Sequence, residues 1–401
     1  MLVPYWRLSG FYGLYFGLIG CIMPFWGLYL QQQSFAVEDI GLLLALFSAV
    51  RIFAPNIWAG TTHLCEKIIA PMQLMRIAGL LMFLCFIAIY WATEFWHYAL
   101  IMLCYGFFWS AILPQYETLT LNYIKDDLDK YSSIRLWGSM GFIFTVSVLG
   151  WMFDFISINY LPAIMLALML AIVLNGFSLP AMGKTKEVCY TSVDPAVADS
   201  SVPAADAITH TGKSVKLSIA SFILMNLLLQ ITHGPYYVFF SIYLQGLGYS
   251  NWAIGLLWSL GVLAEIVVFW RIAFFLRHWS LRELAIICLI LTAIRWLLTA
   301  YFADNSFILI ATQCLHAFSF GLLHAVSVKY IAIFFPGKKQ LHGQALYSGL
   351  GFGLGGAIGA YLAGITWASQ GPEFVFISAA AIALVASLIA VYGLPRENNL
   401  N

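Results

Sequence analysis

Apolar runs long enough to cross a lipid bilayer recur along the whole sequence, separated by short breaks of polar residues, glycine and proline. About twenty consecutive apolar residues span the hydrocarbon core as a helix. The pattern predicts an all-α membrane protein. We expect twelve transmembrane helices, near residues 8–30, 39–59, 71–92, 96–121, 133–154, 158–179, 216–244, 252–276, 281–302, 306–334, 342–368 and 373–394.

The breaks between these runs alternate in their content of basic residues. Those expected on one side contain no Lys or Arg: QQQSFAVED, ATEFWH, DFISIN, QGLGYSN, ADNS and ASQGPE. Those on the other side contain Lys67, Lys125, Lys130, Lys184, Lys186, Lys213, Lys216, Arg277, Arg282, Lys338, Lys339 and Arg396. Because basic loops remain in the cytoplasm, we expect a multi-pass protein of a bacterial inner (plasma) membrane with both termini cytoplasmic.

One long polar segment, residues 180–215, divides the chain into two six-helix halves, 1–179 and 216–401. It lacks the apolar content to fold alone, so we expect a cytoplasmic linker. The halves resemble each other, since YLQQQSFAVEDIGLL at 29–43 aligns without a gap with YLQGLGYSNWAIGLL at 243–257. The same offset pairs Arg51 with Glu265. Parallel six-helix repeats of this kind are typical of secondary transporters, whose sites lie near the midplane between the halves.

Composition supports a membrane protein and excludes several other functions. Of the 401 residues, 62% are hydrophobic and 9% are charged, against roughly 45–50% and about 25% in soluble domains. The net charge of +1 and the scattered basic residues give no indication of nucleic-acid binding. The seven cysteines form no CxxC pair, so we expect no metal, cofactor or disulfide framework. Neither an HExxH motif nor a GxSxG motif is present, which argues against an enzyme.

The stretch GLLWSLGVLAEIVVFW contains one charged residue, Glu265. A charge at the bilayer centre costs about 2.5–3.5 kcal/mol on insertion scales, so such residues normally face a cavity or a partner. Arg295 and His316 lie at similar depths in the next two predicted helices, and we expect the three side chains to meet. Burying three ionisable groups for stability alone would be costly, so we interpret them as a functional, proton-coupling cluster.

Other polar residues and glycines in the C-terminal half can be explained by structural roles. His324 could equally make a hydrogen bond between helices or take part in function. Lys329 lies near the cytoplasmic end of its helix, where it could reach the membrane surface. The glycines of GFGLGG, residues 351–356, follow no soluble strand, so we interpret Gly351, Gly355 and Gly359 as a close helix-packing face.

In the N-terminal half, Glu117 and Arg135 lie toward the cytoplasmic ends of neighbouring predicted helices. One interpretation is an ion pair that closes the cytoplasmic gate. The other is a substrate clamp, because a guanidinium group binds hydroxyl pairs and carboxylates with two parallel hydrogen bonds. Phe25, Trp26 and Phe142, and Trp258 in the C-terminal half, are candidate substrate contacts only if their rings point inward.

The whole chain resembles the major facilitator superfamily, in its lactose-permease-like branch, and within it the 3-phenylpropionate transporter group. The matching stretches are PFWGLYL (24–30), IGLLL (40–44), SIRLWGS (133–139), YSNWAIGLLWSLGVLAEIVVF (249–269), TAIRW (292–296) and LHAFSFGLLHAVSVKYI (315–331). They lie in both halves, so the resemblance implies the major facilitator fold over the whole chain.

The resemblance also assigns roles to individual residues. Glu117 and Arg135 match the substrate-binding acid and arginine of the galactoside symporters, and Phe142 stands where those proteins place a sugar-stacking tryptophan. Glu265, Arg295 and His316 match their cluster for protons and substrate.

Three departures from that pattern change the expectation. Ser319 replaces a carboxylate, Gln313 replaces a lysine, and the loop GTTHLCEK at 60–67 is a degenerate form of the superfamily motif. These departures weaken the case for a sugar and for the usual final proton acceptor.

We therefore expect a monomeric transporter that imports a small organic solute together with a proton by alternating access, with an aromatic acid such as phenylpropionate favoured. Glu265 would carry the proton, while Arg135, Glu117 and Arg51 would hold the substrate. The alternatives are proton symport of a galactoside, oligosaccharide or nucleoside, and efflux of a metabolite or drug by exchange.

Overall fold

The computed structural model describes residues 3–65, 71–124, 127–180 and 215–395. The predicted linker falls almost wholly outside these residues. The described N-terminal part consists of α1 (Tyr5–Cys21), η1 (Ile22–Trp26), α2 (Gly27–Gln32), α3 (Val37–Cys65), α4 (Pro71–Ile87), η2 (Ala88–Trp91), α5 (Phe95–Ile124), α6 (Leu128–Phe153), η3 (Ile158–Tyr160) and α7 (Leu161–Ser178).

The described C-terminal part is also helical throughout. It consists of α8 (Val215–Gly246), α9 (Asn251–Trp270), α10 (Ile272–His278), α11 (Leu281–Phe302), α12 (Ser306–His316), η6 (Ala317–Leu322), α13 (Leu323–Phe334), η7 (Gly337–Lys339), α14 (Gln340–Leu346), η8 (Tyr347–Gly355) and α15 (Gly356–Gly393).

Within the described residues, eleven continuous helical stretches are long and apolar enough to cross a membrane. The last of them, His342–Gly393, contains 52 residues and is interrupted at Gly371, which has φ 81° and ψ 175°. A positive φ suits glycine, and Pro372 has no N–H to continue the helix. The stretch therefore makes two crossings, and the prediction of an all-α membrane protein with twelve transmembrane helices is confirmed.

Polar residues at the breaks start several helices by accepting hydrogen bonds from free backbone N–H groups. Ser250 caps α9, Asn305 caps α12, and Ser280 and Glu283 form a reciprocal capping box at α11. Asp127 caps α6 by accepting from the Lys130 backbone at 3.1 Å. A hydrogen bond from the Lys130 side chain, 2.7 Å away, holds the pKa of the exposed Asp127 below its ordinary value.

In the part of the chain that the structure describes, three membrane helices change locally to π-helix, at Ile22–Trp26, Ala317–Leu322 and Tyr347–Gly355. Such segments are rare and are often found at functional sites, because the extra residue re-aims the side chains that follow. The segment η6 begins directly after His316 and contains Ser319.

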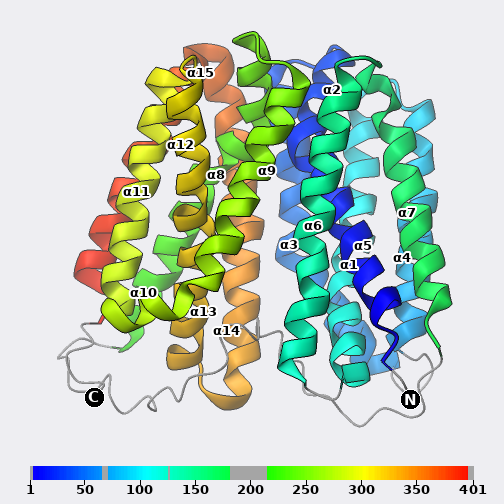
Figure 1. Ribbon diagram of the computed structural model, residues 1–401, viewed down its shortest axis with the longest axis horizontal. Helices are drawn as coiled ribbons and strands as arrows, with labels where there is room; N and C mark the ends of the chain where they lie inside the picture. Colours follow the sequence, from blue (N-terminus) through cyan, green and yellow to red (C-terminus); the bar gives the residue numbers. More distant parts are fainter. Residues whose placement is uncertain (1–2, 66–70, 125–126, 181–214, 396–401) are drawn as a thin grey trace.

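Figure 1 shows two bundles, α1 to α7 and α8 to α15, with both termini at the same end of the molecule. The bundles meet where α6 crosses α9 and where α3 crosses α15. A Cβ atom on Gly41 would lie 2.7 Å from the Cα of Gly364, and one on Gly255 would lie 2.6 Å from the Val146 carbonyl oxygen and 3.3 Å from the Cα of Gly150. Both pairs are related by the offset of the sequence repeat, so the two crossings are equivalent.

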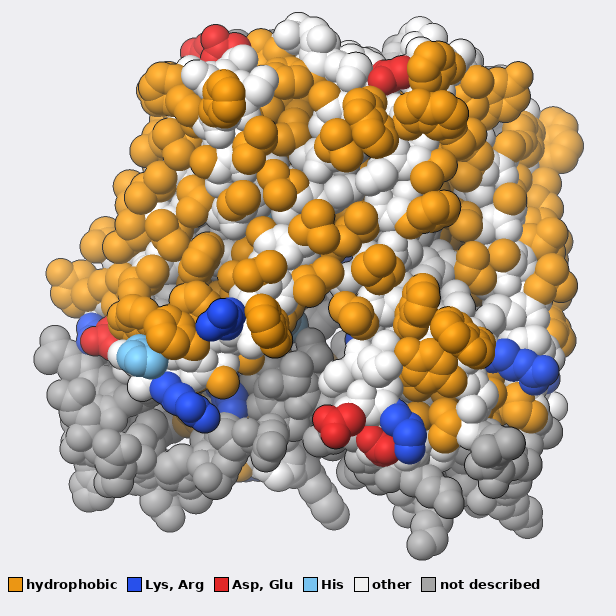
Figure 2. All heavy atoms as spheres, viewed as in Figure 1, with side chains coloured by type: hydrophobic (Ala, Val, Ile, Leu, Met, Phe, Trp, Pro, Cys, Tyr) orange, Lys and Arg blue, Asp and Glu red, His pale blue; other side chains and the backbone are white. Residues whose placement is uncertain are grey.

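The outer surface of both bundles is largely apolar. Figure 2 shows hydrophobic side chains over most of the visible face, with Lys and Arg gathered toward the end that carries the termini. The predicted glycine face of α15 and η8 is confirmed, because Gly351, Gly355 and Gly359 all contact α8. Among the described residues, ionisable side chains inside the bundles include Glu265, Arg295 and His316 in the C-terminal bundle, and Glu117 and Arg135 in the N-terminal bundle.

Candidate functional site

The structure brings Glu265, His316 and Arg295 together as the depth of each in its helix predicts. His316 Nε2 lies 2.9 Å from Glu265 Oε1, and Arg295 Nη1 lies 2.9 Å from His316 Nδ1. The three side chains come from α9, α12 and α11, and Arg295 is fully buried. They form one connected chain of polar contacts inside the C-terminal bundle.

The contacts of His316 define where its proton lies. Arginine can only donate, so the Nδ1 atom facing Arg295 must accept and the imidazole proton is on Nε2. That proton points at the Glu265 carboxylate. His316 is thus a neutral link between an arginine and an acid, and a change in the protonation of Glu265 directly alters the hydrogen bond that His316 makes.

Arg295 is held by aromatic rings as well as by hydrogen bonds. Its Cζ atom lies 4.3 Å from the Tyr236 ring centroid and 4.4 Å from that of Trp296. Its Nη1 atom also donates to Ser319 Oγ at 3.0 Å. Ser319, where the related symporters have a carboxylate, is therefore a direct partner of the buried arginine.

Further residues line this cluster, and of these the sequence drew attention to Gln313 and Trp258 but not to Tyr236, Ser241 or His233. The Tyr236 hydroxyl donates to Gln313 Oε1 at 2.9 Å, and its ring packs 4.5 Å from that of Trp258. Trp258 in turn donates to Ser241 Oγ at 3.0 Å. His233 is fully buried, with Nδ1 2.9 Å from the Leu229 carbonyl. The polar stretch QITHGPYY in an otherwise apolar helix was the available signal.

Two other ionisable residues of the C-terminal bundle lie close to the cluster's helices. His324 Nδ1 is 2.8 Å from the Tyr347 hydroxyl, which matches the hydrogen bond between helices that was one of its two readings. Lys329 is buried, with 8% of its surface exposed, rather than extended toward the membrane surface.

In the N-terminal bundle, Arg135 and Glu117 form an ion pair with Arg135 Nε 3.8 Å from Glu117 Oε1. Both side chains are partly exposed, and the guanidinium lies over the rings of Phe16 and Tyr12 at 4.3 and 5.4 Å. Arg51 lies on α3 with its Cζ atom 6.0 Å from the Phe352 ring of the facing bundle. The three residues predicted to hold substrate therefore sit on separate helices of one bundle.

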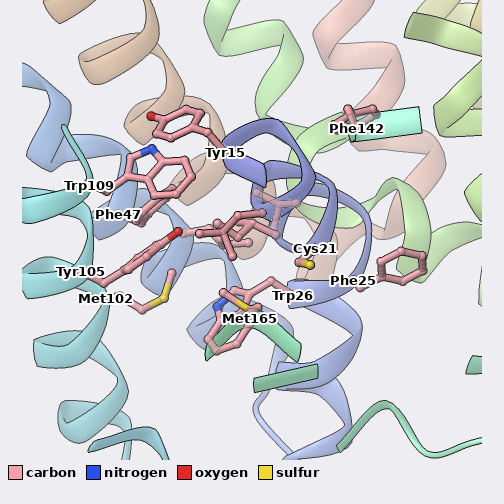
Figure 3. Close-up of a cluster of buried hydrophobic side chains, with 14 of the residues drawn as sticks. Tyr15, Cys21, Phe25, Trp26, Phe47, Met102, Tyr105, Trp109, Phe142 and Met165 are labelled. Carbon is pink, nitrogen blue, oxygen red and sulfur yellow. The ribbon is translucent and has the colours of Figure 1, made fainter. Parts of the chain in front are cut away.

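Trp26 and Phe142, the aromatic candidates for substrate contact, are both buried in this structure. Trp26 is 1% exposed and packs on Tyr29 and Phe86 within its own bundle, and Figure 3 shows it beside Met165. Phe142 is buried and lies apart from the aromatic cluster around Trp109 (Figure 3). Both are packed as core side chains.

Twelve membrane crossings in two bundles around buried ionisable groups define a secondary transporter. The chain belongs to the MFS_1-like family, whose model matches residues 5–378. It is thus a transporter of the major facilitator superfamily and not an enzyme. Within the described residues, no group of three or more His, Cys, Asp or Glu side chains could hold a metal ion.

Proteins named as transporters of several different solutes are similar to this chain over most of their length. The chain is 29% identical to a probable 3-phenylpropionic acid transporter of Escherichia coli (strain K12), covering 96% of each chain. It is 26% identical to a maltose permease of Geobacillus stearothermophilus, covering 88% of this chain and 86% of the permease. The nucleoside transporter NupG has the same fold, with a TM-score of 0.80 at 17% identity, covering 98% of this chain and 99% of NupG.

Proposed function

We propose that this protein imports a small aromatic carboxylic acid together with a proton by alternating access. The observation that carries the proposal is the buried chain Glu265–His316–Arg295, in which His316 Nε2 lies 2.9 Å from the acid and Nδ1 lies 2.9 Å from the arginine. An acid that can gain or lose a proton inside the membrane changes the net charge of the cluster, and such residues mark proton pathways.

In this mechanism Glu265 is the proton carrier. When ionised, it accepts from His316, which is oriented by Arg295. When protonated, it no longer offsets the charge of the arginine, so the two states favour different surroundings. Movement of the two bundles would expose Glu265 to one side and then to the other, and a proton loaded on one side would be released on the opposite side.

The substrate class rests on similarity and on charge. The relative with 29% identity over 96% of this chain is described as a probable 3-phenylpropionic acid transporter. Intramembrane arginines, Arg135 and Arg51 in one bundle and Arg295 in the other, suit an anion. We propose that Arg135, Glu117 and Arg51 contact the substrate from the N-terminal bundle.

We further propose that the protein functions as a monomer in a bacterial inner membrane, with residues 1–179 and 216–401 as its two moving halves. The end carrying the termini would face the cytoplasm. The sequence predicts that the basic breaks share one side of the membrane, and the described Lys and Arg gather at that end on the face shown in Figure 2.

Uptake by purified protein in proteoliposomes tests this function. With an acid-outside pH gradient, labelled 3-phenylpropionate should accumulate above its equilibrium level, and a protonophore should abolish the accumulation. Maltose and uridine serve as competitors. Accumulation of either of these in place of the acid would contradict the proposed substrate class, and accumulation that is insensitive to the protonophore would contradict proton coupling.

A further inference from the structure

Among the buried nitrogen atoms of the C-terminal bundle that have no hydrogen-bond partner within the described residues, four lie on neighbouring side chains. They are Nε and Nη2 of Arg295, Nε1 of Trp296 and Nε2 of His233. The three residues are neighbours, since the His233 and Trp296 rings are 5.2 Å apart and the Arg295 Cζ atom lies 4.4 Å from the Trp296 ring. Buried polar groups are rarely left unpaired, so this concentration indicates a place for a polar ligand.

The unpaired atoms of Arg295 form a particular edge of the guanidinium. Both protons of Nη1 are used, one toward His316 and the other toward Ser319. The rings of Tyr236 and Trp296 both pack against the guanidinium. The Tyr236 hydroxyl donates to Gln313 and turns its oxygen toward the guanidinium as a further acceptor, yet Nε and Nη2 of Arg295 remain without a well-placed partner among the described residues. What remains is the side on which Nε–H and an Nη2–H run parallel.

A carboxylate matches this edge because its two oxygens can accept the two parallel N–H groups at once. We infer that Arg295 binds the carboxylate of the transported acid through Nε and Nη2, with Trp296 Nε1 as an additional donor. The rings of Tyr236 and Trp258, 4.5 Å apart, provide an adjacent aromatic surface for the rest of the substrate. This inference rests on the proposed function and identifies where the acid group of its substrate is held.

The position of this carboxylate-binding site on Arg295 has a consequence for the coupling of substrate to protons. The same guanidinium would then hold the substrate carboxylate on one edge and, through His316, the Glu265 carboxylate on the other. One positive charge cannot offset two buried negative charges, so binding of the substrate anion requires that one proton be taken up by the cluster. We expect one proton to be bound with each monocarboxylate.

Among the described residues, ionisable groups face this site from several helices, and His324 on α13 also lies near Glu265. His233 approaches from α8 and His316 from α12, with ring centroids 6.3 Å apart, and Glu265 is reached from α9 through His316. Tyr236 and Tyr237 lie on α8 beside them. Because Arg295 is fully buried, the acid can reach it only when the surrounding helices move, as alternating access requires.

Binding of an acid and its amide to purified protein tests the inference. 3-Phenylpropionate and 3-phenylpropionamide differ in the group that Arg295 would hold, and the wild type should prefer the acid. Arg295→Lys should reduce that preference about ten- to hundred-fold, since hydrogen bonds to a charged group are lost. Trp296→Phe keeps a ring and removes one donor, so it should reduce the preference several-fold. Binding of the acid in weakly buffered solution should take up about one proton, in keeping with a cluster that cannot hold two uncompensated charges.

The control is Arg76→Lys, since Arg76 bonds to the Gly176 carbonyl in the other bundle and should keep the preference. If Arg295→Lys does not fold, Trp296→Phe decides, and an unchanged preference there overturns the inference. A loss of preference in Arg135→Lys with none in the Arg295 and Trp296 variants would place the carboxylate elsewhere. If the wild type accumulates the acid but the variants keep the wild-type preference for acid over amide, only this inference is contradicted. If the wild type fails to bind the acid, the proposed function is contradicted as well.

Discussion

At the scale of single residues, Glu265 is the group on which proton coupling depends. Glu265→Gln keeps the size of the side chain and can still accept from His316 Nε2, which lies 2.9 Å from the carboxylate, but the amide cannot take up and release a proton. We expect the variant to lose uphill accumulation driven by a pH gradient. Exchange of labelled for unlabelled substrate should continue, because it needs no deprotonation. Both are measured in proteoliposomes.

The two activities also separate the possible roles of this acid. Loss of exchange together with accumulation would assign Glu265 a direct contact with substrate. Full accumulation by the Gln variant would remove it from the mechanism and leave His316 or Glu117 as the proton carrier. Glu94→Gln, in an exposed break between helices, is the control and should behave as the wild type.

Arg135 offers a test between the clamp and the gate. Lysine keeps the positive charge but loses the planar fork, so Arg135→Lys should weaken substrate binding about tenfold or more if the arginine contacts substrate. The amount of protein in the membrane should remain near normal, since the Arg135–Glu117 pair is partly exposed. Binding of ordinary affinity in the Lys variant would favour the gate, in which charge alone maintains the ion pair.

Sequence reasoning could identify Glu265, Arg295 and His316 because a charge in an apolar run is visible from position alone. It could also predict that they meet, because each lies at a similar depth. It could not identify Tyr236 or the unused edge of Arg295, and it could not decide whether the ring of Trp258 points inward. Aromatic residues are common in every membrane helix, and the orientation of a ring depends on helix rotation and packing, which no single stretch of sequence determines.

At the scale of helices, the crossing of α6 and α9 requires glycine. A Cβ atom on Gly255 would lie 2.6 Å from the Val146 carbonyl oxygen, so a larger side chain must push the helices apart. Gly255→Leu should therefore open the end of the molecule away from the termini. Spin labels at residues 156 and 245, one in each bundle, should move apart. Gly246→Leu is the control, because no atom lies within 4 Å of a Cβ there, and unchanged distances in both variants would contradict the prediction.

Helix boundaries followed from sequence more readily than helix geometry did. The break ASQGPE predicted two crossings where the structure has Gly371 in a left-handed conformation, and Pro372 explains why the helix cannot continue. The three π-helical segments were not predicted. A π-helical segment has the same apolar pattern as the helix around it, so the pattern does not reveal it. In η6, the Ser319 hydroxyl donates to the His316 carbonyl at 3.2 Å.

At the scale of the whole molecule, the distribution of basic residues predicts an orientation in the membrane. A reporter placed within 180–215 or after Asn401 should behave as cytoplasmic, and one placed in QGLGYSN should lie outside. The reason is that one set of breaks contains no Lys or Arg at all. Alkaline phosphatase and green fluorescent protein fusions measure the two sides, and an external location for 180–215 would contradict the proposed topology.

Asp154, at the end of α6, joins the two bundles at the end opposite the termini. Its carboxylate accepts from the backbone N–H groups of Asn251 and Trp252 at 2.7 and 3.1 Å, and the Asn251 side chain donates to the Phe153 carbonyl at 3.0 Å. The Asp154 carboxylate thus caps the first turn of α9 from the other bundle. Its negative charge also interacts favourably with the helix dipole at that N-terminus. These bonds exist only while this end is closed.

Asp154→Ala should therefore shift the population toward opening at that end. Loss of a helix cap costs about 0.5–2 kcal/mol, so the ratio of open to closed forms should rise roughly two- to thirty-fold. Spin labels at residues 156 and 245 should report longer distances without any change at the end carrying the termini. The control is Asp304→Ala, because the Tyr249 hydroxyl donates to the Asp304 backbone carbonyl and not to its carboxylate. A distance distribution unchanged by Asp154→Ala would mean that the glycine crossings alone keep the end closed, and a shift of equal size in the control would mean that any loss of negative charge there loosens it.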